Sequence, residues 1–320
     1  MDERDRELLA GSLRELLATP GVDVTTALDE LGWDEVLSDD PAGATTLLFT
    51  EHGRALACSN ALDDVVLAAL GDVGGGEPVR RAVLYPPIGS PVVATEGILV
   101  SDPTRVDEVI VPVLDGLAVV SAAGLSVREA AGFDPDGHWR LARLSDGEPD
   151  PGCLDPTHWG RAVAAGRRAL AAELNGITET ILAIAIEHTT GRVQYGRPIA
   201  GYQSVRHRLA EGHASLEASR SLLEGAWSGV DRADGEGPGG EGCAWAATAA
   251  KAQAGHAYLE VSRHAMQLCG AIGLTFEHRL HRFVQRGAVL DGLLGSAREL
   301  THQMGARLLD GYRPPTVVDL

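Results

Sequence analysis

Apolar residues recur at helical spacing along the first 70 residues of the chain. Leu8, Leu9, Leu13, Leu16 and Leu17 fall on one face, with charged residues between them. Because positions three and four apart share one side of an α-helix, this spacing predicts an amphipathic helix. The same spacing predicts further helices over residues 24–37, 44–57 and 61–70.

The pattern changes over residues 79–145 to short runs rich in valine, isoleucine and leucine. The turn signals PP, GSP and SDP separate these runs at intervals of about ten residues. Short β-prone runs with regular turn signals predict a small antiparallel sheet or barrel. The region is short for a complete barrel, so we expect a truncated one.

From residue 158 onward the helical spacing returns and persists almost to the end of the chain. It predicts four long helices, over residues 158–188, 198–227, 244–268 and 277–309. Long helices with mostly short connections favour an antiparallel bundle. The expected fold class is therefore mainly α with a small β domain. The expected division is an N-terminal helical domain (1–78), a reduced middle β domain (79–150) and a C-terminal four-helix bundle (151–320).

Composition excludes several classes of protein. The 320 residues carry a net charge of −18, with 44% hydrophobic residues and Lys251 as the single lysine. Such a chain is globular, and its acidic balance argues against nucleic-acid binding, which needs clustered basic residues. The four cysteines form no CxxC pair, so a disulfide framework or zinc ribbon is not expected. The acidic N-terminus and the lack of a long uncharged apolar run predict a cytoplasmic protein without a membrane span.

Two stretches carry candidate binding residues. In residues 191–211, Arg192, Gln194 and Tyr195 lie on a predicted helix-to-helix corner, and Gln203 follows in the next helix. Guanidinium and amide groups on such a corner can hold a phosphate or pyrophosphate. Local chemistry alone favours an ordinary solvated corner.

The second stretch covers residues 267–282. Gln267 closes a predicted helix, and Gly270 suits the left-handed conformation that ends many helices. Taken alone, this stretch is a helix C-cap followed by a turn.

Together, at this separation, the two stretches resemble the acyl-CoA dehydrogenase family. Members of that family carry RxQFGxPI…fQ between two bundle helices and QxxGGxG at the end of the third. The matching segments here are RVQYGRPI (192–199) with Gln203, and QLCGAIG (267–273). The resemblance covers residues 160–310 firmly and the rest of the chain loosely.

The resemblance implies the acyl-CoA dehydrogenase fold and the cofactor FAD, bound across a subunit interface. It implies that this chain contacts the pyrophosphate and adenosine of a flavin seated mostly in a neighbouring subunit. The residues that this mapping assigns to FAD are Arg192, Gln194, Tyr195, Gln203, Gln267 and Gly270.

The catalytic base of the family is harder to find in this sequence. Most members carry a Glu in a Tyr-Glu-Gly-Thr turn, and counting from Arg282 places that position on Asp291. Asp291 is one methylene shorter than Glu, and a solvated or capping Asp is the favoured interpretation. Some members carry the base on the first bundle helix instead, and that register lands near Gly166, which cannot serve.

The segments that surround the flavin ring in the family are largely missing. YPPIGSPVV (85–93) is only a remnant of one of them, and nothing matches the other. The chain resembles the shorter, non-catalytic subunits of actinobacterial heterotetrameric (α2β2) enzymes that act on steroid side-chain CoA thioesters. The resemblance then implies a longer catalytic partner that supplies the Glu base, and an acyl-CoA substrate.

Two alternatives stay open from the sequence. The chain is a self-sufficient flavoenzyme that uses Asp291 as its base, or it is a flavin-free helical interaction subunit. No metal site is expected, because His278 and His281 have no carboxylate or cysteine at ligand spacing.

Overall fold

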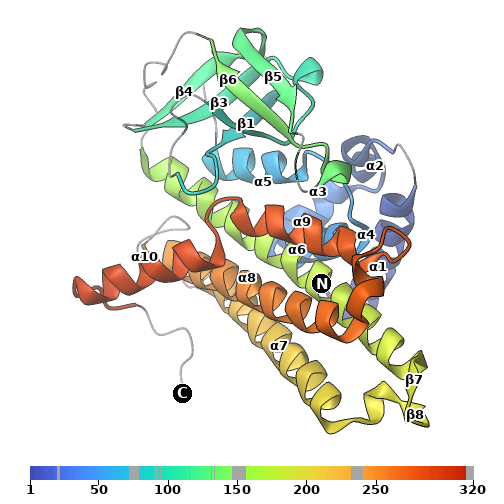
Figure 1. The fold of residues 1–320 in the computed structure, drawn as a ribbon. Helices are drawn as coiled ribbons and strands as arrows, with labels where there is room; N and C mark the ends of the chain where they lie inside the picture. The colour runs from blue at the N-terminus through green and yellow to red at the C-terminus, as the bar shows by residue number, and fades with distance from the viewer. Residues whose placement is uncertain are drawn as a thin grey trace.

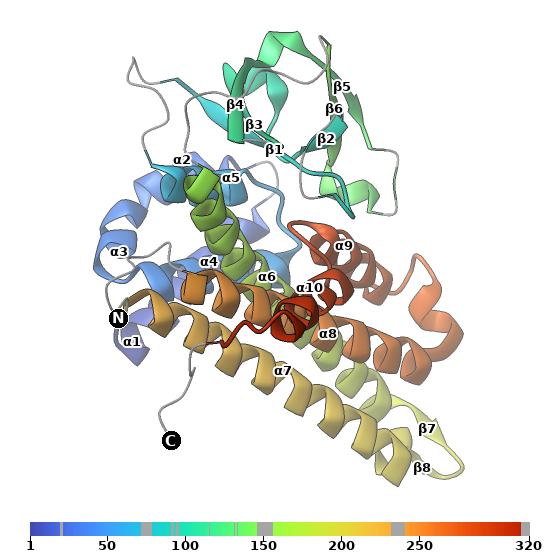
Figure 2. The ribbon, with the colours of Figure 1, turned by 90° about the vertical axis from the view of Figure 1, so that its left-hand side faces the viewer.

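The computed structural model describes residues 1–19, 22–71, 79–90, 93, 96–114, 116–130, 132, 134–145, 156–231 and 241–314. Within these ranges a small sheet lies over one end of a larger helical body (Figures 1 and 2). The Gly- and Pro-rich stretches 72–78 and 146–156, which predict linkers, and the acidic stretch 229–242, which predicts a loop, fall wholly or mostly outside the described residues.

Five helices form the N-terminal part. They are α1 (Glu3–Ala18), α2 (Val24–Glu30), α3 (Trp33–Asp39), α4 (Pro41–Ala55) and α5 (Ala61–Leu70). The prediction of one helix over 24–37 is wrong, because Gly32 takes a left-handed φ of 70° and separates α2 from α3. Asp40 begins α4 by accepting a hydrogen bond from the backbone N–H of Gly43 at 2.8 Å.

The sheet has six strands in the order β4-β3-β1-β2-β6-β5. They are β1 (Arg81–Tyr85), β2 (Glu96–Leu99), β3 (Glu108–Val113), β4 (Gly116–Ser121), β5 (Leu125–Glu129) and β6 (Arg140–Leu144). The prediction of a purely antiparallel sheet is wrong at one pair, because β1 and β3 run parallel. Alternate residues of β1 face opposite sides: Val83 and Tyr85 join the main helical core, whereas Ala82 and Leu84 join a second core within the sheet.

The C-terminal part contains α6 (Pro156–Gly191), α7 (Gln203–Asp231), α8 (Glu241–Cys269), α9 (Leu280–Gly292) and α10 (Ala297–Leu309). Between α6 and α7 lie the short strands β7 (Val193–Gln194) and β8 (Arg197–Pro198). The 3-10 helices are η1 (Pro103–Arg105), η2 (Ala122–Gly124), η3 (Pro135–Gly137), η4 (Ile199–Gly201) and η5 (Gly270–Leu274).

Two predicted boundaries of this bundle are wrong. The second bundle helix begins at Gln203 rather than at 198, because β8 and η4 occupy the intervening residues. The helix predicted over 277–309 is two helices, since Leu294 and Gly295 have φ values of 55° and 103°. Ser296 then begins α10 with a capping box to Glu299.

Helix α6 runs through the centre of the molecule and packs against α4, α5, α7, α8 and α9. From His158 to Gly191 it is long and apolar enough to cross a membrane, which the sequence analysis did not anticipate. However, 78% of its most apolar window is buried inside the protein. Packing against the other helices therefore accounts for its apolar character.

Helices α4 and α6 approach each other at two glycines. A Cβ atom on Gly176 would overlap the backbone carbonyl of Thr50, and one on Gly53 would overlap the carbonyl of Glu173. Each glycine thus faces the backbone of the other helix. The two helices could not cross at this distance with any larger residue at either position.

A buried carboxylate joins the N-terminal helices to the sheet. Asp63 on α5 is fully buried and accepts hydrogen bonds from the hydroxyls of Tyr85 (2.8 Å) and Ser101. Burial raises the pKa of Asp63 to about 7, because the charged form loses its hydration. The junction is therefore most stable when this carboxyl is protonated.

The glycine crossing predicts a large cost for Gly176→Ala. The added methyl group would force α4 and α6 apart, which we expect to lower the free energy of unfolding by about 2–3 kcal/mol. Gly160→Ala is the matched control on the same helix, since nothing lies within 4 Å of its added Cβ. We expect this control to gain about 0.5–1 kcal/mol from helix propensity. Urea unfolding of both variants measures the difference, and equal stabilities would contradict the packing argument.

The Asp63 junction predicts a pH-dependent stability. Between the unfolded pKa of about 4 and the folded pKa of about 7, the folded state holds a proton that the unfolded state has lost. The free energy of unfolding therefore falls as pH rises through this range. Relative to Asp63→Asn, the wild type should lose about 2 kcal/mol between pH 5 and pH 7.

Urea unfolding at several pH values tests this expectation. Asp102→Asn is the control, because hydrogen bonds from Thr104 lower the pKa of Asp102 and keep it charged throughout this range. The control should retain the wild-type pH slope. A slope that Asp63→Asn leaves unchanged would show that this carboxyl does not titrate there.

Candidate functional site

The two stretches that resemble flavin-binding motifs lie at the same end of the bundle. Near the end of α6, the ring of His188 lies 6.2 Å from the ring of His278, in the segment that follows α8. Glu187 and Arg279 also pair across this junction at 3.7 Å. The corner that carries β7 and β8 projects from the same end of the bundle, as Figure 1 shows.

The same junction contains a group of ligand-type side chains that sequence spacing did not bring together. His188, Cys269 and His278 place one ligand atom each within 4.8 Å of one another. His281 is not part of this group; its Nδ1 lies 2.6 Å from the carbonyl oxygen of His278. The backbone N–H of Leu280 lies 3.3 Å from Nδ1 of His278, which ties the group to the start of α9.

The predicted flavin contacts are exposed. All six residues of the predicted set are exposed to solvent: Arg192, Gln194, Tyr195, Gln203, Gln267 and Gly270. Tyr195 is 94% exposed and has a left-handed φ of 52°, which makes it the tip of the β7–β8 turn. The Arg192 carbonyl accepts a hydrogen bond from the N–H of Ile199 at 2.8 Å, which closes this corner.

These residues suit an anionic nucleotide that approaches from outside the chain. Among the described residues, no carboxylate lies within ion-pair distance of the Arg192 guanidinium. Gly270 has a φ of 65°, and its missing side chain opens onto free space, so a ligand can reach the backbone there. FAD carries a pyrophosphate, and an unpaired guanidinium and an exposed backbone turn are both groups that can bind one.

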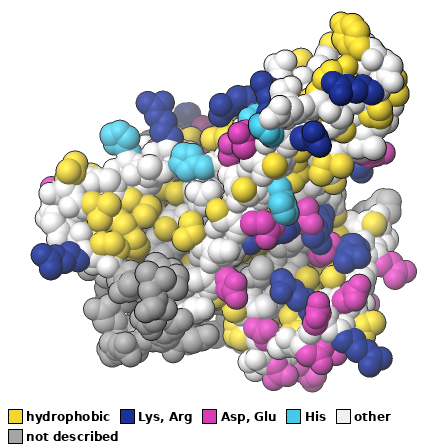
Figure 3. Space-filling view, turned by 90° about the horizontal axis from the view of Figure 1, so that it is seen from below, with side chains coloured by type: hydrophobic (Ala, Val, Ile, Leu, Met, Phe, Trp, Pro, Cys, Tyr) yellow, Lys and Arg dark blue, Asp and Glu magenta, His cyan; other side chains and the backbone are white. Residues whose placement is uncertain are grey.

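Exposed apolar side chains surround these polar groups. Val193 (54% exposed) and Tyr195 lie on the corner, and Ile272, Leu274 and Phe276 follow Gly270. Phe276 is 93% exposed. In the view from below, arginine, histidine and hydrophobic side chains mix along the projecting end at the upper right (Figure 3). The acidic side chains gather instead over the N-terminal helices at the lower right of that figure.

Asp291, the predicted position of the base, lies within helix α9 and is only 9% exposed. Its Oδ1 accepts a hydrogen bond from the backbone N–H of Ala297 at 3.0 Å, at the start of α10. Its carboxylate packs closely against Gly255 on α8. Asp291 therefore holds two helices in place and does not line the cavity described below.

Lys251 secures the same turn from α8. It is fully buried, and its Nζ donates to the carbonyl oxygens of Asp291 (2.9 Å) and Gly295 (3.3 Å). Burial lowers the pKa of Lys251 to about 8. Arg167 adds a hydrogen bond from its Nε to the carbonyl of Leu294 at 3.0 Å. The turn between α9 and α10 is thus held through its backbone.

Leu294, rather than Asp291, faces the first bundle helix. A Cβ atom on Gly166 would lie 2.6 Å from Cδ1 of Leu294. The segment Leu293-Leu294-Gly295-Ser296 also forms a turn, as Tyr-Glu-Gly-Thr does in the motif, whereas Asp291 is helical. Gly166 and Leu294 thus meet at this turn, and neither side chain can accept a proton.

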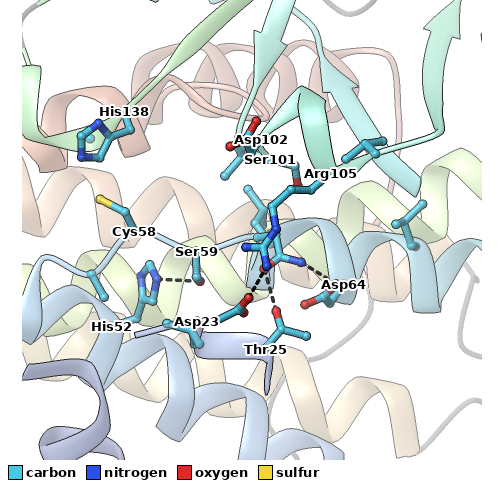
Figure 4. A pocket seen from close by; sticks show the side chains of 18 of the residues that line it. Asp23, Thr25, His52, Cys58, Ser59, Asp64, Ser101, Asp102, Arg105 and His138 are labelled. Carbon is cyan, nitrogen blue, oxygen red and sulfur yellow. Dashed lines mark hydrogen bonds and ion pairs between the residues drawn. The ribbon is translucent and has the colours of Figure 1, made fainter. Parts of the chain in front are cut away.

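A cavity of about 740 Å³ lies between the N-terminal helices, the sheet and α9. Figure 4 shows polar side chains along its wall, among them Asp23 and Arg105, which pair at 2.6 Å. The hydrogen bond from Arg105 lowers the pKa of Asp23, whereas burial raises the pKa of Asp64 to about 6. Sequence reasoning missed this cavity, because its walls come from segments far apart in the chain.

Comparison with known proteins agrees with this geometry. The family model described as "Acyl-CoA dehydrogenase, C-terminal domain" matches residues 160–309. Acyl-CoA dehydrogenase IpdE2 of Mycobacterium tuberculosis is 31% identical over 265 residues, which span 81% of this chain and 75% of that protein.

Two solved structures share the fold. The ChsE4-ChsE5 complex from Mycobacterium tuberculosis gives a TM-score of 0.75 at 19% identity, covering 98% of this chain and 99% of that one. A variant of the Tcur3481-Tcur3483 steroid ACAD gives a TM-score of 0.73 at 22% identity, covering 96% and 98%. The predicted fold class is confirmed, and with the IpdE2 relationship it follows that the chain belongs to the acyl-CoA dehydrogenase family.

Proposed function

We propose that this chain is one subunit of a heteromeric, FAD-dependent acyl-CoA dehydrogenase. It contributes contacts to the pyrophosphate and adenosine of FAD, and a longer partner subunit holds the flavin ring and supplies the Glu base. The assembly is an α2β2 heterotetramer, and this chain is divided into domains at residues 1–78, 79–150 and 151–320.

The observation that carries the proposal is the exposure of every residue in the predicted flavin-contacting set. Arg192, Gln203 and Gln267 are exposed. Groups that hold a cofactor within one chain lie in a concave, mostly pre-formed site. Groups exposed on a projecting end suit a cofactor seated in another subunit, and the apolar residues around them suit the interface with that subunit.

The turn between α9 and α10 supports the assignment of the base to the partner. Acyl-CoA dehydrogenation needs a carboxylate that removes the α-proton while hydride leaves the β-carbon for the flavin. Neither Gly166 nor Leu294, which meet at this junction, has a side chain that can accept a proton. Asp291 is committed to the N–H of Ala297, so its role here is to join two helices.

The substrate class is a CoA thioester, and the likeness to a solved structure described as a steroid ACAD favours a steroid side-chain acyl group. The ChsE4-ChsE5 structure is a complex of two differently named chains, which supports a partner for this chain.

The first test compares the chain purified alone with the chain co-expressed with a longer acyl-CoA dehydrogenase encoded beside it. We expect a colourless chain alone and a yellow complex whose solution mass fits two copies of each subunit. A yellow, active homo-oligomer would favour the self-sufficient enzyme. A colourless product in both cases would favour the flavin-free interaction subunit.

Arg192→Ala should weaken flavin binding by the complex about tenfold or more, since a charged hydrogen bond contributes about 1.5–3 kcal/mol. Fluorescence titration of the deflavinated complex with FAD measures the dissociation constant. Arg4→Ala is the control, because Arg4 is an exposed arginine on α1, in the N-terminal part. Unchanged FAD affinity in Arg192→Ala would remove this arginine from the cofactor site.

Asp291→Asn should leave turnover per bound flavin in the complex within about twofold, because a side-chain amide oxygen can still accept the N–H of Ala297. Stopped-flow reduction of the flavin by acyl-CoA measures the chemical step directly. A loss of about a hundredfold or more with flavin still bound would identify Asp291 as the base.

A further inference from the structure

Three side chains from separate segments form a hydrogen-bonded chain on the wall of the cavity. His52 lies on α4, Ser59 in the connection between α4 and α5, and Glu173 on α6. Nε2 of His52 lies 2.9 Å from Oγ of Ser59, and Nδ1 of His52 lies 3.0 Å from Oε1 of Glu173. Figure 4 shows His52 and Ser59 pointing toward each other.

The partners of His52 fix the direction of these hydrogen bonds. An ionised carboxylate can only accept, so the proton between Glu173 and His52 belongs to Nδ1. Nε2 of the neutral imidazole then keeps its lone pair and accepts the hydroxyl proton of Ser59. A hydroxyl, an imidazole base and a carboxylate that orients the base are the three parts of an activated serine nucleophile.

Exposure to the cavity increases along the chain of three groups, from Glu173 through His52 to Ser59. Glu173 is 3% exposed and His52 is 6% exposed, whereas Ser59 is half-buried. His52, Ser59 and Glu173 all line the 740 Å³ cavity. The carboxylate is therefore sheltered from water, while the hydroxyl is open to a ligand.

Ser59 also lies beside a source of positive electrostatic potential. The N–H of Ala61, the first residue of α5, donates to Oγ of Ser59 at 3.2 Å. The first N–H groups of a helix have no partners within the helix, and the helix dipole adds partial positive charge there. This hydrogen bond stabilises the negative charge that develops on Oγ of Ser59 as its proton moves to His52.

We propose that Ser59 and His52, with Glu173 as a positioning residue, form a hydrolytic site for activated acyl esters; the narrower substrate class, acyl thioesters, rests on the proposed function. This activity goes beyond the proposed dehydrogenation and requires neither the flavin nor the partner. The cavity volume is in the range of pockets that hold a medium-sized ligand, so it accommodates the acyl group next to Ser59.

The reaction runs in two balanced halves. Oγ of Ser59 bonds to the carbonyl carbon as its proton moves to Nε2 of His52; the carbon–sulfur bond then breaks, and His52 returns the proton to the departing sulfur. A water molecule next attacks the Ser59 ester, giving one proton to His52, which passes it to Oγ. One thioester and one water thus give one carboxylic acid and one thiol, without oxidation or reduction.

Covalent labelling tests the site on the full chain without any substitution. A fluorophosphonate probe reacts with activated serines, and peptide mass spectrometry identifies the modified residue. We expect modification of Ser59 in the wild type and its loss in Ser59→Ala. Ser12→Ala, at an exposed serine on α1, should label like the wild type. A wild-type chain that leaves Ser59 unmodified would overturn the proposal.

Hydrolysis of p-nitrophenyl butyrate and of butyryl-CoA supplies the kinetic readout. Ser59→Ala should lower the rate about a hundredfold or more, the usual effect of losing a nucleophile or its base. Glu173→Gln should lower kcat, calculated per folded chain from the circular-dichroism signal, while KM stays within about twofold. Ser59→Ala with the wild-type hydrolysis rate would also overturn the proposal. Flavin content does not enter either assay, so this result is independent of the dehydrogenase assignment.

Discussion

The backbone contact between α4 and α6 is the constraint on which the rest of the structure depends. Gly53 and Gly176 let the two helices meet at the distance of their main chains. His52 precedes Gly53 directly, and Glu173 lies one turn before Gly176, so the same crossing brings these two side chains into contact. Both of these side chains line the cavity between the N-terminal helices, the sheet and α9. Packing and chemistry thus share one geometric origin.

The two ends of the bundle have opposite character. At the α9–α10 turn, the side chains of Lys251 and Asp291 form hydrogen bonds with neighbouring backbone groups, and Leu294 packs against Gly166. At the β7–β8 corner, Arg192 and its neighbours are exposed and unpaired with any described carboxylate. The polar groups at the α9–α10 turn therefore stabilise the fold, whereas those at the β7–β8 corner are available to bind another molecule. This asymmetry is consistent with the proposal that the chain is a subunit that shares its cofactor.

Much of the fold could be predicted from the sequence, because helix periodicity and motif spacing are local properties. The two flavin-type stretches and the bundle follow from residues close together in the chain. The errors arose where single residues override the periodicity, at Gly32 and at Leu294-Gly295, whose left-handed φ values end helices that the apolar spacing would continue. The parallel pairing of β1 and β3 was also missed, since pairing partners are not encoded by alternation alone.

The candidate site was less predictable than the fold, because its contacts join residues that lie far apart in the chain. Counting from Arg282 placed the base on Asp291, but sequence spacing does not show that this side chain accepts a hydrogen bond from the N–H of Ala297 at the start of α10. The contact between His52 and Glu173 spans 121 residues and depends on the helix crossing. No sequence spacing contains that information. A motif whose residues lie close together in the chain can be recognised from the sequence. A site whose residues come from different helices can be recognised only in the folded structure.

The burial of Lys251 determines how the protein reacts with amine-specific reagents. It is the only lysine in the sequence, and none of its side chain is open to solvent. Every exposed cationic side chain other than histidine is therefore an arginine, whose guanidinium does not react with acylating reagents as an amine does. Modification of Lys251 by an amine-specific reagent can occur only when the α8–α10 contact opens. The rate at which Lys251 is modified therefore reports local opening at the α9–α10 turn, without any engineered label.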